Sequence, residues 1–199
     1  MKNYVFLLIL MFCFFKSESQ VFLNGGNICE DQKFNLVFED DFDGPLDQTD
    51  WYTYFPYGEG NSDDCSFCRT HDDQIPFGEG QIYLDENVRT EGGKLIFDVK
   101  NEPATWFNQS KNYTSGMIHG KKHFGYGKFE IRCKIPDGYA HFPAFWVQAG
   151  NHEIDIFESW GPENGPTDKF KCSVHNYNVE TSDFWVEPEI DLSLDFHTY

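Results

Sequence analysis

Glu153-Ile154-Asp155-Ile156-Phe157-Glu158 is a stretch in which acidic and apolar residues alternate, and it decides what kind of fold surrounds it. Alternate residues of a β-strand share one face, so the first two acids point away from the isoleucines between them. The two consecutive apolar residues, Ile156 and Phe157, indicate a one-residue β-bulge, which returns Glu158 to the face of the other acids. The stretch therefore predicts a bulged strand with three carboxylates on one face.

The rest of the chain also shows short strand patterns, bounded by Gly, Pro, Asn or Asp. These patterns cover residues 36–41, 81–84, 94–99, 116–119, 128–135, 145–148, 153–158, 170–177 and 184–186. Because the strands are many, short and evenly spaced, they predict an all-β antiparallel sandwich. A polar segment between Pro56 and Gly80 is either a binding loop or a disordered insertion.

The beginning of the chain has the layout of a secretory signal peptide. Lys2 precedes an apolar run from Tyr4 to Phe15, and small and polar residues follow. The run is too short to cross a bilayer comfortably. We therefore expect residues 1–19 to be a signal peptide, residues 20–35 an N-terminal extension and residues 36–199 one domain. The mature protein should be secreted, either extracellular or periplasmic, without a membrane partner once the signal is removed.

Net charge and cysteine content further restrict the possible binding partners and metal sites. The formal net charge of −18 argues against nucleic acid as a partner. Cys65-Ser66-Phe67-Cys68 has the spacing of a zinc half-site, but a second ligand pair is lacking and an exported chain favours a disulfide. Cys133 and Cys172 alternate with apolar residues, so both are predicted to be core thiols.

A second strand pattern predicts what lies next to the acids. In residues 169–177, Phe170, Cys172 and Val174 form the core side, and His175 and Tyr177 lie on the other side. If this strand pairs with residues 153–158, the imidazole and the phenol face the same cleft as the acids. Aromatic rings stack on sugars, and carboxylates and imidazole bind hydroxyls or move protons, so carbohydrate is the expected ligand.

Clustered carboxylates suit glycoside hydrolysis, which needs one ionised and one protonated acid across the scissile bond. Like charges held close cannot all remain ionised, so crowding separates the two protonation states. The same three acids are also compatible with a solvated acidic face or a calcium site.

Five motifs in a fixed order favour the catalytic alternative. They are Glu39-Asp40-Asp41-Phe42-Asp43-Gly44, Tyr113-Thr114-Ser115-Gly116-Met117-Ile118, residues 124–132, Pro143-Ala144-Phe145-Trp146 and residues 153–158. From about Leu36 to Tyr199 the chain resembles glycoside hydrolase family 16, laminarinase type. The resemblance implies a concanavalin A-like β-jelly-roll sandwich of two curved antiparallel sheets, and an endo-acting hydrolase that retains configuration at the anomeric carbon.

The resemblance also implies roles for individual residues. Glu153 would be the nucleophile, Glu158 the general acid/base and Asp155 a helper that tunes both. A retaining pair of carboxyl groups should lie about 5 to 5.5 Å apart. Three further residues match positions that line the sugar subsites: Trp160, His175 and, as a weaker candidate, Trp146. The resemblance implies no required cofactor and no catalytic metal, although a structural calcium ion occurs in many family members.

The chain departs from the family pattern in two places and at its end. Phe142 stands where many members have Trp, and Met117 stands where many have Arg, so the preferred sugar could differ. Phe196-His197-Thr198-Tyr199 resembles the beginning of a strand that continues in the family into further strands. We therefore expect a sandwich that is incomplete at the C-terminus, in a monomeric protein.

The expected substrate is β-1,3-glucan or mixed-linkage β-1,3-1,4-glucan, because an acidic surface repels sulfated polysaccharides. Two alternatives remain: a hydrolase of algal galactans (agar, porphyran, carrageenan), and a non-catalytic β-glucan-binding protein. The second is disfavoured because all three acids are present.

Overall fold

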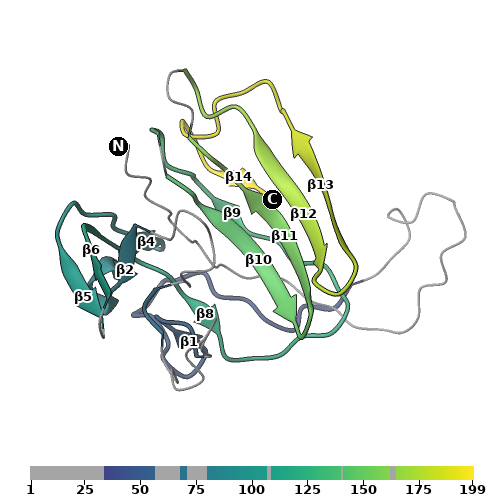
Figure 1. Ribbon diagram of the computed structural model, residues 1–199. Coiled ribbons are helices and arrows are strands. Elements are labelled where there is room, and N and C mark those ends of the chain that lie inside the picture. Colours follow the sequence, from purple (N-terminus) through teal and green to yellow (C-terminus); the bar gives the residue numbers. More distant parts are fainter. Residues whose placement is uncertain (1–33, 57–67, 71–79, 107–108, 140, 162–164) are drawn as a thin grey trace, which may run out of the picture.

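The computed structural model describes residues 34–56, 68–70, 80–106, 109–139, 141–161 and 165–199 (Figure 1). The predicted signal peptide and nearly all of the predicted N-terminal extension lie outside these ranges, as does most of the polar segment between Pro56 and Gly80. Within the described ranges no helix has the length and apolar character needed to cross a membrane.

The regular structure is β-strand throughout the described residues, apart from one short 3₁₀ turn, η1 (Asp85–Asn87). The strands are β1 (Trp51–Tyr52), β2 (Gln81–Tyr83), β3 (Val88–Thr90), β4 (Leu95–Phe97), β5 (Ala104–Trp106), β6 (Gln109–Lys111), β7 (Tyr113–Ser115), β8 (His119–Gly120), β9 (Arg132–Cys133), β10 (Ala144–Ala149), β11 (His152–Glu158), β12 (Phe170–Asn176), β13 (Glu180–Val186) and β14 (His197–Thr198). The all-β prediction is confirmed.

Four long strands form the main sheet, in the order β10-β11-β12-β13, with every neighbouring pair antiparallel (Figure 1). The other strands form two-stranded ladders, among them β14 with β9 and the parallel pair of β2 with β7. Residues in and beside β9 and β14 pack against Phe145 and Phe157 of the main sheet, so this ladder forms a second layer.

Apolar side chains fill the space between the main sheet and the β9–β14 ladder. Phe157 of β11 is fully buried there, with its ring 6.5 Å from that of Phe145 and 4.5 Å from that of Tyr199. Ile131 and Ile135 flank β9 in the same cluster. We call this side of the main sheet its apolar face, and the opposite side, which carries the three acids, its acidic face.

Several sequence predictions of strands need correction. Residues 36–41 have no regular secondary structure and form no ladder, and residues 116–119 are in a ladder only at His119. Phe38 is nevertheless buried in a core cluster with Trp51 and Trp146, so alternation here predicted burial and not strand pairing. The predicted strand at the C-terminus is confirmed as β14.

Two residues predicted to lie in the core are exposed. Ile154 and Val174 pair across β11 and β12 and have 47% and 52% of their surface exposed. The alternation of apolar and polar residues in the sequence correctly assigned both side chains to the apolar face. The buried cluster on this face lies towards Phe157, however, and no described segment buries the end of the sheet at this pair.

The cysteine predictions hold in part. Cys133 is a buried free thiol, whereas the free thiol Cys172 is only half buried and donates to the carbonyl of Ile156. Cys68 is disulfide-bonded, which supports the disulfide interpretation of the Cys65–Cys68 pattern over a zinc half-site. Cys29 and Cys65 lie outside the described ranges.

Candidate active site

The predicted bulge is present in β11. Asp155 pairs with Ser173 and Glu158 with Lys171, so three steps along β11 oppose two steps along β12. On the other side, the pairing of β11 with β10 leaves Ile156 as the extra residue. An extra residue shifts the alternation by one position, which brings Glu158 to the acidic face.

Cross-strand pairing arranges the acidic face in three rows, since residues paired across antiparallel strands share a face. The rows are Gln148–Glu153–His175–Thr181, Trp146–Asp155–Ser173–Asp183 and Ala144–Glu158–Lys171–Trp185. Each row contains one of the three acids. The bulge therefore places the three carboxylates in one cluster on the acidic face.

Glu153 is held by two side chains of the neighbouring segment. The Tyr177 hydroxyl donates a hydrogen bond of 2.8 Å to Glu153 Oε2, and His175 Nε2 lies 3.9 Å from Oε1. The rings of His175 and Tyr177 are stacked, with centroids 5.7 Å apart. These contacts orient a carboxylate that is otherwise open to the acidic face.

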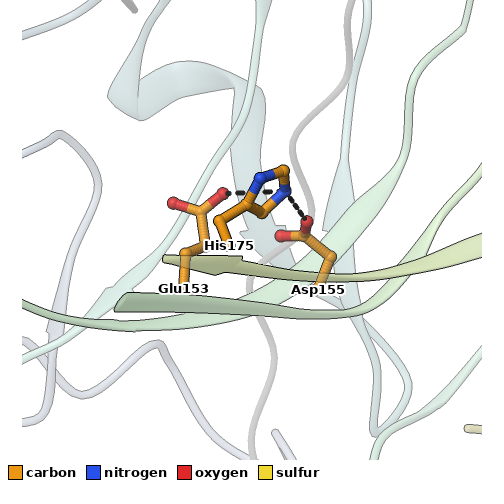
Figure 2. Close-up of side chains that lie close together, drawn as sticks. All are labelled: Glu153, Asp155 and His175. Carbon is orange, nitrogen blue, oxygen red and sulfur yellow. Dashed lines mark hydrogen bonds and ion pairs between the residues drawn. The ribbon is translucent and has the colours of Figure 1, made fainter. Parts of the chain in front are cut away.

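The carboxylate of Asp155 faces the His175 ring, which lies between Asp155 and Glu153 (Figure 2). His175 Nε2 is 2.8 Å from Asp155 Oδ2, and His175 Nδ1 is 2.9 Å from the Thr181 hydroxyl. Asp155 is only 3% exposed. Burial, followed by the charges of Glu158 and Glu153, raises the pKa of Asp155 to about 7, although contact with His175 opposes this rise.

Glu158 is bound on its β12 side. Its Oε2 atom lies 3.4 Å from Lys171 Nζ and accepts a hydrogen bond of 3.4 Å from the Ser173 hydroxyl. Burial raises the pKa of Glu158, and the positive charge of Lys171 partly offsets that effect. A carboxyl group with a raised pKa retains its proton closer to neutral pH, as a general acid requires.

The two tryptophans singled out from the sequence have different surroundings. Trp160 is 37% exposed, and its ring lies 4.6 Å from that of Phe142 and 5.0 Å from the Lys171 ammonium. Trp146 pairs with Asp155 but is 7% exposed and packs in a core cluster. Trp160 therefore offers a ring surface to a ligand, whereas the Trp146 ring is buried beside Asp155 as part of a core cluster.

Among the described residues, one group could provide three protein ligands to a metal ion: Glu153, Asp155 and His175, whose ligand atoms lie within 4.8 Å of one another. Calcium takes six to eight oxygen ligands. This group offers two carboxylates and an imidazole already hydrogen-bonded to one of them, so it does not fit a structural calcium ion. The calcium site implied by the resemblance remains a prediction.

Sequence reasoning did not assign a role to Lys171 or Trp185 in this cluster. Both lie in the row of Glu158, but only the register of β11, β12 and β13 reveals it. The parity of Lys171 was visible in the sequence, whereas its opposition to Glu158 was not.

Comparison with known proteins identifies the group to which this architecture belongs. Residues 81–199 match the family model described as glycosyl hydrolases family 16. The chain belongs to glycosyl hydrolase family 16. The five motifs, the bulge and the acid cluster are thus explained together, and the family is one of glycosidases, which hydrolyse O-glycosyl bonds.

Individual members of this family are similar over much of the chain. A glucan endo-1,3-beta-glucosidase of Cryptopygus antarcticus is 27% identical over the whole chain and 68% of that protein. A beta-glucanase of Rhodothermus marinus is 30% identical over 68% of the chain and 42% of that protein. The chain thus spans well under half of the second relative.

A solved structure gives the same result for the fold. The laminarinase catalytic domain from Thermotoga maritima MSB8 superimposes with a TM-score of 0.67 at 28% identity, over 84% of this chain and 69% of that domain. The predicted jelly-roll class is confirmed, and the described sheets correspond to part of such a sandwich.

Proposed function

We propose that this family 16 protein is an endo-acting glycosidase that cleaves β-1,3- or mixed-linkage β-1,3-1,4-glucan with retention of configuration. The observation that supports this proposal most directly is the bulge in β11, which brings Glu153, Asp155 and Glu158 to one face of the main sheet. A retaining mechanism requires two carboxyl groups with different protonation states, and the surroundings of these acids differ accordingly.

In the first step Glu158 donates its proton to the glycosidic oxygen while a carboxylate oxygen of Glu153 attacks the anomeric carbon. The bond between that carbon and the leaving oxygen breaks, and a glycosyl ester with Glu153 forms. Burial of Glu158 favours its protonated form, and the hydrogen bond from Tyr177 keeps Glu153 in place for the attack.

In the second step Glu158, now ionised, takes a proton from water. The water oxygen attacks the anomeric carbon on the opposite side from the ester, and Glu153 is released. Two inversions at one carbon give net retention. Asp155 and His175 share a hydrogen bond next to both glutamates. A change in the charge of either glutamate therefore changes the electrostatic environment of this pair.

Two observations favour a neutral glucan as the substrate. The similar proteins are named as a glucan endo-1,3-beta-glucosidase, a beta-glucanase and a laminarinase. In addition, the net charge of −18 disfavours long-range attraction of sulfated galactans. Trp160, exposed beside the acids, supplies a ring on which a pyranose can stack. We propose that the protein acts outside the cell, in keeping with the predicted signal peptide.

A polysaccharide panel tests the activity. The full chain is incubated with laminarin, lichenan, agarose and carrageenan, and new reducing ends are measured. We expect reducing ends from laminarin or lichenan. Binding to laminarin without new reducing ends would overturn the enzyme in favour of a β-glucan-binding protein, and release from agarose or carrageenan alone would overturn the glucan assignment.

Azide rescue tests the two glutamate roles separately. In Glu153→Ala, azide enters in place of the nucleophile and should give a glycosyl azide of inverted configuration. In Glu158→Ala, azide attacks the glycosyl ester from the other side and should give the retained configuration. The substrate is an aryl glucoside with an activated leaving group. NMR distinguishes the two anomers of the glycosyl azide. The opposite pairing of anomers would exchange the two roles.

A further inference from the structure

Trp185 lies on the acidic face in the same row as Glu158, but on the outermost strand of the main sheet. It pairs with Lys171 across β12 and β13, and Lys171 pairs with Glu158 across β11 and β12. Neighbouring strands are about 4.8 Å apart, so Trp185 is displaced by roughly 10 Å from the backbone of Glu158. Half of its surface, 51%, is exposed.

The ring of Trp185 is held in contact with the aromatic residues beside the acids. Its centroid lies 5.6 Å from that of Trp160, and Trp160 in turn lies 4.6 Å from Phe142. The ammonium groups of Lys169 and Lys171 lie over Trp185 and Trp160, respectively, at 5.4 and 5.0 Å from the ring centroids. The rings of Phe142, Trp160 and Trp185 therefore form a continuous row that begins beside the acid cluster and ends on β13.

The position of Trp185 is not that of a core residue. Its neighbours on the acidic face of β13 and β12 include Asp183 and Lys171, which form an ion pair. Phe184, the preceding residue, points to the apolar face, as the pairing of Phe184 with Cys172 shows. An indole half exposed among charged groups and packed at an interplanar angle of 54° against the exposed Trp160 has the properties of a sugar platform, since it offers an apolar surface with a polar edge.

We propose that Trp185 and Trp160 together form a subsite that binds a pyranose ring of the glucan on the Glu158 side of the scissile bond. The proposal rests on the function proposed above and adds a specificity-determining residue to it. Because Trp185 is two strands away from Glu158, the ring bound there differs from the ring that reacts.

The proposal predicts a dependence on substrate length. A long glucan reaches both the acids and Trp185, whereas a short oligosaccharide that fills only the positions next to the acids does not touch Trp185. Loss of the indole should therefore lower kcat/KM for laminarin and leave kcat/KM for the shortest cleaved oligosaccharide unchanged. A general weakening of the sheet would lower both.

The experiment compares Trp185→Ala and Trp185→Phe with Phe184→Ala, a matched control one residue away on the opposite face with 61% exposure. Laminarihexaose binding is measured by calorimetry in Glu153→Gln versions of the full chain. We expect Trp185→Ala to weaken binding about tenfold, or ~1.4 kcal/mol, and Trp185→Phe to retain most of the affinity. Phe184→Ala should bind as the parent does.

A second measurement needs no substitution at the site. N-bromosuccinimide oxidises exposed tryptophans, and peptide mass spectrometry reports oxidation of Trp185 alone. Laminarihexaose should slow this oxidation, and maltohexaose, which has a different linkage, should not. Equal oxidation with and without laminarihexaose would overturn the subsite, as would equal losses of affinity in Trp185→Ala and Phe184→Ala.

The outcomes distinguish the subsite from the function on which it rests. If the parent chain cleaves laminarin but Trp185→Ala behaves like the parent on every substrate length, the subsite is wrong and the glucanase stands. If the parent cleaves no β-glucan at all, the proposed function fails, and the subsite fails with it.

Discussion

Lys171 Nζ lies 3.4 Å from Glu158 Oε2, and thereby places a positive charge next to the carboxyl group proposed as general acid. Burial raises the pKa of Glu158, whereas Lys171 lowers it. Lys171 Nζ is also 3.6 Å from Asp183 Oδ2, so its charge is shared between two carboxylates. The lysine thus limits how far burial can raise the pKa of the acid.

Replacement of this lysine should move the pH profile in a defined direction. In Lys171→Met the pKa of Glu158 rises, because the opposing positive charge is gone while burial and the charge of Glu153 remain. The basic limb of kcat/KM reports deprotonation of the acid, so it should shift to higher pH.

The measurement is the pH dependence of laminarin hydrolysis at substrate concentrations well below KM. Lys134→Met is the control, since Lys134 is exposed outside the acid cluster and loses the same charge. A basic limb that stays in place or moves to lower pH in Lys171→Met would contradict the proposed role of Glu158 as the acid.

Asp155 should make the stability of the protein depend on pH. Its pKa is raised from 3.8 to about 7 by burial and by the neighbouring glutamates, so native Asp155 keeps a proton that the unfolded chain loses near pH 4. Native protein then binds more protons than unfolded protein between these values, and the free energy of unfolding falls as pH rises from about 4 to about 7.

Asp155→Asn removes this titration. We compare the free energy of unfolding of the variant with that of the parent. The difference, variant minus parent, should increase between pH 4.5 and pH 8 by an amount on the order of 2 kcal/mol. Urea denaturation at several pH values provides the measurement, and Asp137→Asn, at an exposed position, provides the control. A difference that does not change with pH would show that Asp155 ionises near its ordinary value.

The bulge in β11 was predictable because its cause is local. Ile156 and Phe157 break a strict alternation within six residues, and a one-residue shift is the simplest way to keep both the apolar pair and Glu158 on suitable faces. Strand identity for β11 and β12 followed from the same kind of local pattern. The family motifs extended these local inferences to a fold.

The partners of the acids were less accessible to sequence reasoning. The hairpin between β12 and β13 turns after Asn176, where Val179 donates to the Asn176 carbonyl, and this turn fixes Trp185 opposite Lys171. Alternation assigns a residue to a face but says nothing about which residue lies across from it. For the same reason it could not reveal that Ile154 and Val174 remain exposed on the apolar face.

Tyr177→Phe should impair catalysis without affecting the fold. The variant loses the hydroxyl that donates to Glu153 Oε2 but retains the ring stacked on His175. The nucleophile then lacks its orienting donor, and we expect kcat to fall about tenfold, as for loss of one hydrogen bond to a charged group. Tyr126→Phe, at a fully exposed position, is the control. Unchanged kcat in Tyr177→Phe would mean that this hydrogen bond does not orient Glu153 during the reaction.

Phe157→Ala should destabilise the protein more than any change on the exposed part of the sheet. Phe157 is fully buried and packs against Phe145, Phe170 and Tyr199 on the apolar face, directly before Glu158. Removal of a buried phenylalanine ring costs about 3 to 5 kcal/mol, because transfer energy is lost and a cavity remains. Phe184→Ala, at a mostly exposed ring, should cost less than about 1 kcal/mol. Chemical denaturation of both variants tests this ranking.

Since Phe157 anchors the bulge that orients Glu158, the activity of Phe157→Ala, measured well below its unfolding temperature, should also fall. Full activity there would show that the strand pairing of Glu158 with Lys171 holds the acid in place without the anchor.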